Sequence, residues 1–434
     1  MTFSRRDTLK LGGALSLAGL AAGASRASQT VDPKASQAPG KPNVDYRPVI
    51  TPNGSTLPYK LRDGVKVFHM IAEEVAHEFT PGLEANCWGY NGQVHGPTIE
   101  AVEGDTVRIY VTNKLPAATT VHWHGLIIPS GMDGVGGLNQ HPIEPGETYV
   151  YEFKLIQHGT FMYHSHHDEM TQMAMGMMGM IVIHPRKPTG PLPDRDFVMM
   201  LSEWSIEPGT NRPDPNAMAD FNVLTFNARC FPGTDALVAK QGERVRIRYG
   251  NLSAMDHHPV HLHGYAFKVT ETDGGPIPKE AQWPETTVLV PTGATRTVEF
   301  IADNPGDWAM HCHMTHHVMN QMGHDLDLVI GADGDKLEEA LNSALPGTMM
   351  MGSDGMGDHG KHVEMGHMNI PENSIPMVGA NGPMGYITMG GMFTILKVRP
   401  DITSYDDPGW YEEKPEQQAR LATDEELTAD GIAL

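Results

Sequence analysis

The chain of 434 residues is long enough for two or three domains. Its formal net charge of −22 argues against nucleic acid as a partner and is compatible with a cationic metal or a neutral organic substrate. Glycine and proline are plentiful (47 and 33 residues), as in turn-rich β proteins, and 23 histidines and 28 methionines supply many borderline and soft metal ligands.

A paired arginine near the N-terminus is followed by an apolar run of small residues. Arg5 and Arg6 precede this run, which ends at Ala22. The pattern predicts a twin-arginine signal peptide over residues 1–27, and therefore a periplasmic protein. The run is shorter than the ~20 residues that cross a bilayer, so no membrane span is expected. Residues 28–57 are polar and proline-rich and are expected to form an extended linker.

Short alternating strands begin at about residue 58, and the same order of features returns from about residue 195. In the stretch 104–113 apolar residues alternate with polar ones, which is typical of a strand with one buried face. Four landmarks recur at near-equal spacing, which predicts two copies of one β domain over 58–190 and 195–333. The landmarks are residues 104–109 and 242–247, residues 122–125 and 261–264, Gly146 and Gly293, and residues 159–166 and 306–313.

The character of the sequence changes after residue 333. Residues 335–345 have one apolar face, as in a short helix. Residues 348–368 are rich in methionine, glycine and histidine and lack the periodicity of a core. Residues 386–396 fit a strand or hairpin packed on a domain. We therefore expect 334–434 to be a Met-rich segment followed by a C-terminal extension.

Histidines gather in four clusters along the two repeats. Alternating histidines on a strand place both imidazoles on one face, so that each His-X-His pair can clamp a metal ion. A single pair is weak evidence, but four pairs at repeat-related positions, one of them split by a cysteine, strongly indicate metal binding. The clusters are residues 122–124, 164–166, 258–263 and 311–322.

The second repeat carries the ligand types of a blue-copper site. Such a site has two histidines, one thiolate and a weakly bound methionine thioether. Aligning the repeats places Thr119, Ser165, Met170 and Met175 opposite the four candidate ligands, so the first domain lacks three of the four ligand types. We therefore expect the blue copper in the second domain alone. The candidate ligands are His258, Cys312, His317 and the axial Met322.

Eight further histidines remain, four from each domain. His311 and His313 point away from the side of the strand that Cys312 faces, so they are free to hold a second metal centre behind the first. Eight imidazoles suit a three-copper cluster, with two ligands for one ion and three for each of the others. The eight are His122, His124, His164, His166, His261, His263, His311 and His313.

The four clusters, in this order, resemble those of multicopper oxidases, and both repeats resemble cupredoxin domains. The resemblance covers roughly residues 58–333, and residues 122–134 and 251–264 are similar to bacterial copper-resistance oxidases. It implies an all-β protein of two Greek-key β-sandwiches with four copper ions per chain, in which His122 and His261 hold the type 2 copper. The type 3 pair would then be held by His124, His164, His166, His263, His311 and His313.

Three-domain members of this family have an extra cupredoxin domain between the second and third clusters. The stretch from His166 to His258 is too short for one, so the chain resembles the two-domain laccases. In that group the cluster lies between domain one of one subunit and domain two of the next. The resemblance therefore implies a homotrimer. Pairing of the two histidine sets within one chain stays open.

The resemblance implies an oxidase that takes electrons from Cu(I) or from phenol- and amine-type donors and reduces dioxygen to water. Cys312 would pass the electrons through His311 and His313. Asp133 matches an acidic position that assists proton delivery in related oxidases, although an aspartate before a glycine is also a common turn residue. A second acidic position of the family is Val318 here.

Two other functions remain alternatives. A copper nitrite reductase is also two-domain and trimeric, but its blue copper lies in the first domain, where Ser165 and Met170 replace the ligands. A non-catalytic copper-sequestering protein is suggested by residues 348–368, which equally fit a Cu(I)-loading or covering loop. Cys87 and Cys230 are either a disulfide pair or two unrelated free thiols.

Overall fold

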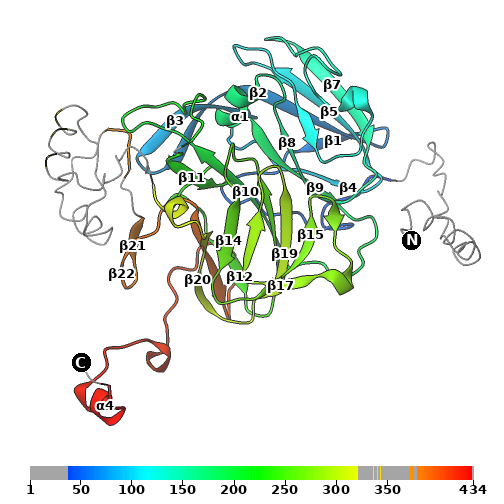
Figure 1. Cartoon of the computed structure of the whole chain (residues 1–434). Helices are drawn as coiled ribbons and strands as arrows, with labels where there is room; N and C mark the ends of the chain where they lie inside the picture. The colour runs from blue at the N-terminus through cyan, green and yellow to red at the C-terminus, as the bar shows by residue number, and fades with distance from the viewer. Residues whose placement is uncertain are drawn as a thin grey trace, which may run out of the picture. The chain divides into compact units, whose positions relative to one another are not determined.

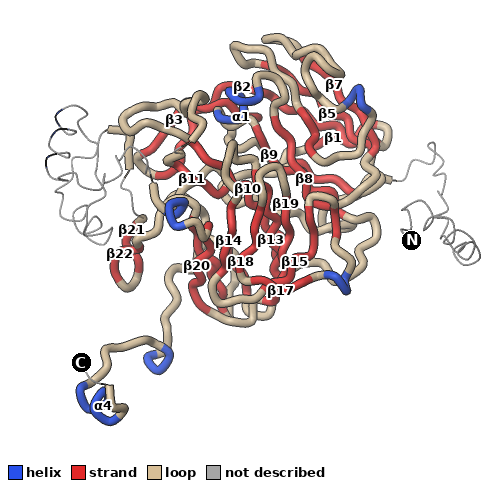
Figure 2. Tube along the Cα trace, viewed as in Figure 1, coloured by secondary structure: helices blue, strands red, loops and turns tan. Residues whose placement is uncertain are grey.

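The computed structural model describes residues 38–219, 221–320, 336, 340, 343, 372–375 and 379–432 (Figure 1). Strands are the main regular structure of the described body, and helices are short segments (Figure 2). Three features expected from the sequence lie outside the described residues: the signal peptide over 1–27, the axial Met322 and the Met-rich segment over 348–368. Among the described residues, no helix is both long and apolar enough to cross a bilayer.

Domain 1 consists of two sheets that share one core. One sheet has the order β1-β2-β5-β7 with β3 beside β2, and the other has the order β4-β9-β8-β6. Buried residues from both sheets form a single apolar cluster, which makes a β-sandwich. The strands are β1 (Tyr59–Arg62), β2 (Val65–Thr80), β3 (Leu83–Tyr90), β4 (Ile99–Val102), β5 (Thr106–Asn113), β6 (His122–His124), β7 (Thr148–Lys154), β8 (Gly159–His164) and β9 (Met178–His184).

Domain 2 repeats this plan with longer sheets. Its first sheet has the order β11-β10-β13-β19-β15-β16 with β17 beside β15, and its second has the order β12-β23-β20-β14-β18. The strands are β10 (Arg195–Trp204), β11 (Val223–Phe226), β12 (Leu237–Lys240), β13 (Arg244–Asn251), β14 (His258–Leu262), β15 (Phe267–Thr272), β16 (Gly275–Pro276), β17 (Trp283–Glu285), β18 (Thr287–Val290), β19 (Thr295–Ile301), β20 (Gly306–Cys312) and β23 (Phe393–Arg399).

The remaining elements lie outside the two sandwiches or connect their strands. Strands β21 (Ala380–Gly382) and β22 (Gly385–Ile387) pair as a hairpin. The short helices are η1 (Ser130–Met132), α1 (Glu169–Ala174), η2 (Lys279–Ala281), η3 (Thr315–Val318), η4 (Pro415–Gln417) and α4 (Asp424–Ala429).

The alternation seen in the sequence sets the faces of the strands. In β5, Val107, Ile109 and Val111 are buried, while the residues between them are half-buried or exposed. The matching strand of domain 2, β13, buries Val245 and Ile247 in the same way. The prediction of an all-β fold with two related domains is therefore confirmed.

Two stretches pack against the β-sandwiches although the sequence places them outside both domains. Strand β23 pairs with β12 and β20, so domain 2 extends beyond the boundary expected at residue 333. The stretch expected to be an extended linker contacts both domains: Ile50 bridges to Phe197, and Glu100 accepts a hydrogen bond from the backbone of Val49 at 3.0 Å. Residues 38–57 therefore bind the body instead of running free.

Arg248 ties the two domains together from a fully buried position. Its guanidinium donates to both carboxylate oxygens of Asp196, at 2.8 and 3.0 Å, and to Glu271 at 3.1 Å. The same side chain reaches domain 1, where the hydroxyl of Thr160 accepts a hydrogen bond at 2.8 Å. The hydroxyl of Thr295 donates to the carbonyl of Thr160 at 2.8 Å. These bonds hold β8 of domain 1 against β13 and β19 of domain 2.

Cys87 and Cys230 are free thiols buried in one apolar cluster. Burial raises the pKa of each thiol to about 12, which keeps both protonated and unreactive. Of the two alternatives for these cysteines, the structure has the free thiols.

Candidate metal centres

Three of the predicted blue-copper ligands converge in domain 2. His258 begins β14, Cys312 ends the neighbouring β20, and His317 lies on η3 directly after it; all three are buried. The sulfur of Cys312 is 3.7 Å from Nδ1 of His258 and 3.4 Å from Nδ1 of His317, and the two nitrogens are 3.2 Å apart. A point about 2 Å from all three atoms lies at their centre, which is the distance of a metal–ligand bond.

Neighbouring side chains fix which ring nitrogen of each histidine faces this centre. Nε2 of His258 is 2.6 Å from the hydroxyl of Ser253, and Nε2 of His317 is 3.4 Å from the carboxylate of Asp256. Both Nδ1 atoms are therefore left to face the sulfur of Cys312. Such outer partners orient metal-bound imidazoles.

Burial sets the protonation of this site when no metal is bound. It lowers the pKa of His258 to about 3 and raises the pKa of the Cys312 thiol to about 12. The histidines are thus neutral, as ligands must be, whereas the thiol keeps its proton until a metal displaces it.

The equivalent place in domain 1 contains a hydrogen-bonded polar cluster. Ser165 stands where domain 2 has Cys312, and its hydroxyl donates to Oε1 of Gln172 at 2.5 Å. The hydroxyl of Thr119 donates to the same oxygen at 2.7 Å. Met170, expected opposite His317, points outward with 61% of its surface exposed. Gln172 thus fills the space that the copper ligands line in domain 2.

The four predicted histidines of domain 1 form one group on β6, β8 and the turn after β8, which we call the first quartet: His122, His124, His164 and His166. Ligand atoms of His122, His124 and His164 all lie within 4.8 Å of one another. The ring of His166 lies 5.4 Å from that of His122, centre to centre. The register of the strands explains this grouping, because His122 is paired directly with His164.

Backbone carbonyls orient the rings of the first quartet. Nδ1 of His122 donates to the carbonyl of Asp133 at 2.7 Å, and Nδ1 of His164 donates to that of Ser165 at 2.8 Å, which leaves Nε2 of both rings for a metal. His124 is reversed: its Nε2 donates to the carbonyl of Gly293 in domain 2 at 2.9 Å, so Nδ1 is the available atom. Burial lowers the pKa of His164 to about 3.

The four predicted histidines of domain 2 form a second quartet on β14, β20 and the residue after β20: His261, His263, His311 and His313. Nδ1 of His261 donates to the carbonyl of Thr286 at 2.7 Å, and Nδ1 of His311 donates to that of Cys312 at 2.8 Å. Nε2 of His263 and Nε2 of His311 are 3.2 Å apart. This quartet is more open to solvent than the first, since His263 and His313 are exposed.

The two quartets do not touch within one chain. The described residues include all eight histidines, and no ring contact or hydrogen bond joins one quartet to the other. The first quartet lines a cavity of about 580 Å³ whose other walls come from α1 and β9 of domain 1 and from domain 2, including Trp204, Leu252 and Thr292. None of the second quartet lines it.

Glu203 is a buried acid in this cavity that sequence reasoning missed. Its Oε1 accepts the backbone N–H groups of Met255 at 2.5 Å and Asp256 at 3.4 Å, while its Oε2 is buried with no hydrogen-bond partner. Burial, with the nearby Asp256 carboxyl, raises the pKa of Glu203 to about 8. No motif pointed to Glu203, because its role depends on a loop some fifty residues later in the chain.

Asp133, the predicted proton-delivery residue, lies beside the first quartet. Its carboxylate is 3.4 Å from Nδ1 of His122, whose hydrogen goes to the Asp133 carbonyl. The other carboxylate oxygen accepts from Asn139 at 3.3 Å. Asp133 is therefore placed to act through His122, and its backbone also makes the turn after η1, so both readings of this residue are compatible with its position.

A buried trio of one thiol and two imidazoles, beside two histidine quartets, is the ligand set of a copper protein of two β-sandwich domains. Comparison with known proteins agrees, because residues 72–188 and 207–328 match sequence models of the multicopper oxidase family. Together these matches cover more than half of the chain. The chain belongs to the multicopper oxidase family, and its all-β fold is the one expected from the sequence.

Two relatives illustrate how far the likeness extends. Copper resistance protein A of Escherichia coli is 31% identical over 255 residues, which are 48% of this chain and 42% of that protein. Copper resistance protein A of Pseudomonas syringae pv. tomato is 30% identical over 241 residues, which are 44% of this chain and 39% of that protein. The chain thus spans less than half the length of these relatives.

Solved structures match over a larger share of the chain. The multicopper oxidase mgLAC has a TM-score of 0.57 and 28% identity, over 81% of this chain and 91% of that one. The blue copper oxidase from Nitrosomonas europaea has a TM-score of 0.56 and 25% identity, over 80% of this chain and 91% of that one.

Proposed function

We propose that this protein couples the one-electron oxidation of Cu(I), or of phenol- and amine-type donors, to the four-electron reduction of dioxygen to water. The observation that carries the proposal is the sequence His311-Cys312-His313. Peptide bonds join Cys312 of the buried trio directly to His311 and His313 of the second quartet. When bound, copper would supply reversible one-electron transfer at the trio and dioxygen reduction at the quartets. Four copper ions per chain would occupy these ligands.

The chain's own residues would carry electrons and protons between the two sites. From the sulfur of Cys312, one peptide step leads to each histidine, and the Cys312 carbonyl accepts a hydrogen bond from His311 at 2.8 Å. Formation of water consumes protons. Glu203, with its unpartnered Oε2 in the cavity of the first quartet, would hold one there. Asp133 would assist proton delivery through the ring of His122.

We also propose that the active oligomer is a homotrimer in which each cluster forms between two chains. Support comes from the separation of the quartets within one chain and from the exposure of His263 and His313. A head-to-tail ring of three subunits would bring the second quartet of one chain to the first quartet of the next, and such a ring closes without leaving an unpaired quartet. We further propose that a twin-arginine signal directs export of the protein to the periplasm.

Copper counting combined with oxygen uptake tests the proposed function. The copper-loaded protein should hold four ions per chain and consume oxygen with Cu(I) or a methoxyphenol. Cys312→Ser should abolish the blue absorption and donor-driven oxygen uptake while three ions remain. Cys230→Ala, which removes a buried thiol that contacts the carbonyl of Phe79, should keep both properties. Two ions per chain would contradict the oxidase and favour a nitrite-reductase-like protein, and four ions without oxygen uptake from any donor would favour copper sequestration.

A further inference from the structure

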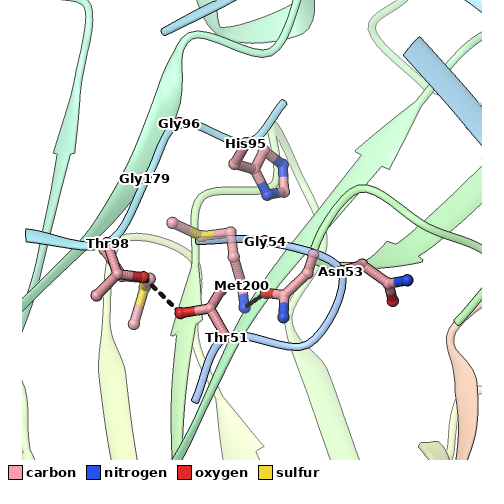
Figure 3. A pocket seen from close by; sticks show the side chains of 10 residues that line it. Thr51, Asn53, Gly54, His95, Gly96, Thr98, Gly179 and Met200 are labelled. Atoms are coloured by element: carbon pink, nitrogen blue, oxygen red, sulfur yellow. Dashed lines mark hydrogen bonds between the residues drawn. The ribbon is translucent and has the colours of Figure 1, made fainter. Parts of the chain in front are cut away.

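A second group of potential metal ligands surrounds a small buried cavity beside His95. The cavity has a volume of about 10 Å³, which is room for one small ion or one water molecule. Figure 3 shows the His95 ring and the Met200 side chain lining this space. Met180 also lines it, and no charged side chain does. Neither the trio nor the quartets contribute to this cavity.

One nitrogen of His95 is held by a hydroxyl. Its Nε2 lies 2.9 Å from the hydroxyl of Ser202, which in turn lies 2.7 Å from that of Thr225. In the tautomer in which Nε2 donates to Ser202, Nδ1 keeps a free lone pair. A metal bound at Nδ1 would select this tautomer.

Nδ1 of His95 is buried and has no partner. His95 is only 7% exposed, and its Nδ1 makes no hydrogen bond in the described part of the chain. Burial lowers the pKa of His95 to about 3, so the ring stays neutral. A polar atom left unpaired at such a depth is destabilising, so a ligand that binds it would stabilise the fold.

The polar side chains around the cavity offer little to a water molecule. The hydroxyls of Thr51 and Thr98 bond each other at 2.8 Å. The amide of Asn227 donates to the carbonyls of Pro52 and Val198 and accepts from the backbone of Met200. Asn53 is likewise bonded to residues 233 and 235. Because a buried water usually needs two to four polar partners, these groups disfavour one.

Methionine thioethers are instead concentrated beside the cavity. Met162, Met178, Met180 and Met200 belong to one buried cluster between the two domains. The sulfurs of Met180 and Met162 lie 2.5 and 3.0 Å from the point where a side chain would begin at Gly250, so the missing side chain of this glycine makes room for them. Of these four methionines, Met180 and Met200 line the cavity together with His95.

We propose that this cavity binds one Cu(I) ion through Nδ1 of His95 and the thioethers of Met180 and Met200. Soft thioether and imidazole ligands select Cu(I) among biological metals. The site has no anionic ligand, so burying a divalent ion there would leave two positive charges uncompensated, whereas Cu(I) brings only one. The proposal does not depend on oxidase activity, because it concerns a bound ion that takes no part in donor oxidation.

Silver(I), which has the charge and ligand preference of Cu(I) but no redox chemistry here, provides the test. The full-length protein would be titrated with Ag(I), and bound ions would be counted by native mass spectrometry. Met200→Leu should bind one ion fewer per chain than the wild type. Met199→Leu is the matched control, since Met199 is equally buried on the opposite face of β10, and it should keep the wild-type count.

Crystals of the wild-type protein soaked in Ag(I) give an independent answer that needs no variant. An anomalous peak between His95 and Met200 would support the site. A water molecule at that position, or equal ion counts for the wild type and Met200→Leu, would overturn it. Neither readout involves oxygen uptake, so failure of this proposal and failure of the proposed oxidase function can be told apart.

Discussion

The hydroxyl of Ser165 lies 3.4 Å from that of Thr119 in domain 1, at the two positions where domain 2 has Cys312 and His258, whose ligand atoms are 3.7 Å apart. The two domains thus keep one backbone geometry and fill it with different chemistry. In domain 1 Gln172 accepts hydrogen bonds from both hydroxyls, and in domain 2 a metal would satisfy the corresponding ligands. This relationship explains why domain 2 alone presents the ligands of the proposed blue-copper site.

Gln172→Leu should destabilise domain 1 without affecting copper. The substitution leaves the buried hydroxyls of Thr119 and Ser165 without their acceptor, which should lower the free energy of unfolding by ~1–3 kcal/mol. Denaturant unfolding of the variant would measure this, with Gln241→Leu, at an exposed position, as the control. An unchanged free energy of unfolding, or the loss of one copper ion, would show that Gln172 does not have the role assigned to it.

Asp196→Ala should be among the most destabilising single changes in the chain. It leaves the fully buried Arg248 without its two-pronged partner, and breaking a buried ion pair from one side costs ~3–5 kcal/mol. Glu152→Ala removes the acid from the exposed pair with Arg108 and should cost under ~1 kcal/mol. Thermal unfolding of both variants makes the comparison, and equal losses of stability would contradict the bridging role of Arg248.

Glu203→Gln should flatten the pH dependence of stability. The pKa of Glu203 in the folded protein, about 8, lies above its ordinary value, so the acid stabilises the fold at low pH and this contribution is lost as the pH rises toward 8. The wild type should therefore lose on the order of 3 kcal/mol between pH 5 and 8 that the glutamine variant keeps. Melting temperatures across this range, with the exposed Glu144→Gln as control, would reveal the difference. Parallel curves for wild type and Glu203→Gln would refute the buried, protonated carboxyl.

Local geometry made much of the copper site predictable. Strand alternation alone places His311 and His313 opposite Cys312, and the repeat assigns the trio to domain 2. The structure brings together His258, Cys312 and His317 as expected, while Met322 lies outside the described residues.

Features that depend on long-range contacts were not predictable. Gln172 reaches the polar cluster only because α1 folds back against Thr119, and β23 joins β20 across a long intervening stretch. The unpartnered Nδ1 of His95 depends on the packing of His95 against Ser202, far along the chain, which no local pattern encodes.

The central claim is that the two quartets of different chains form one centre, and subunit mixing tests it most directly. His164→Ala removes a ligand from the first quartet, and His263→Ala removes one from the second, so each variant alone should take up no oxygen. Mixed oligomers would be made by co-expression with two affinity tags. In a head-to-tail trimer that carries both tags, one junction in three would join two intact quartets, so oxygen uptake should return to about a third of the wild-type rate. Mixed oligomers that form but stay inactive would contradict a centre shared between chains.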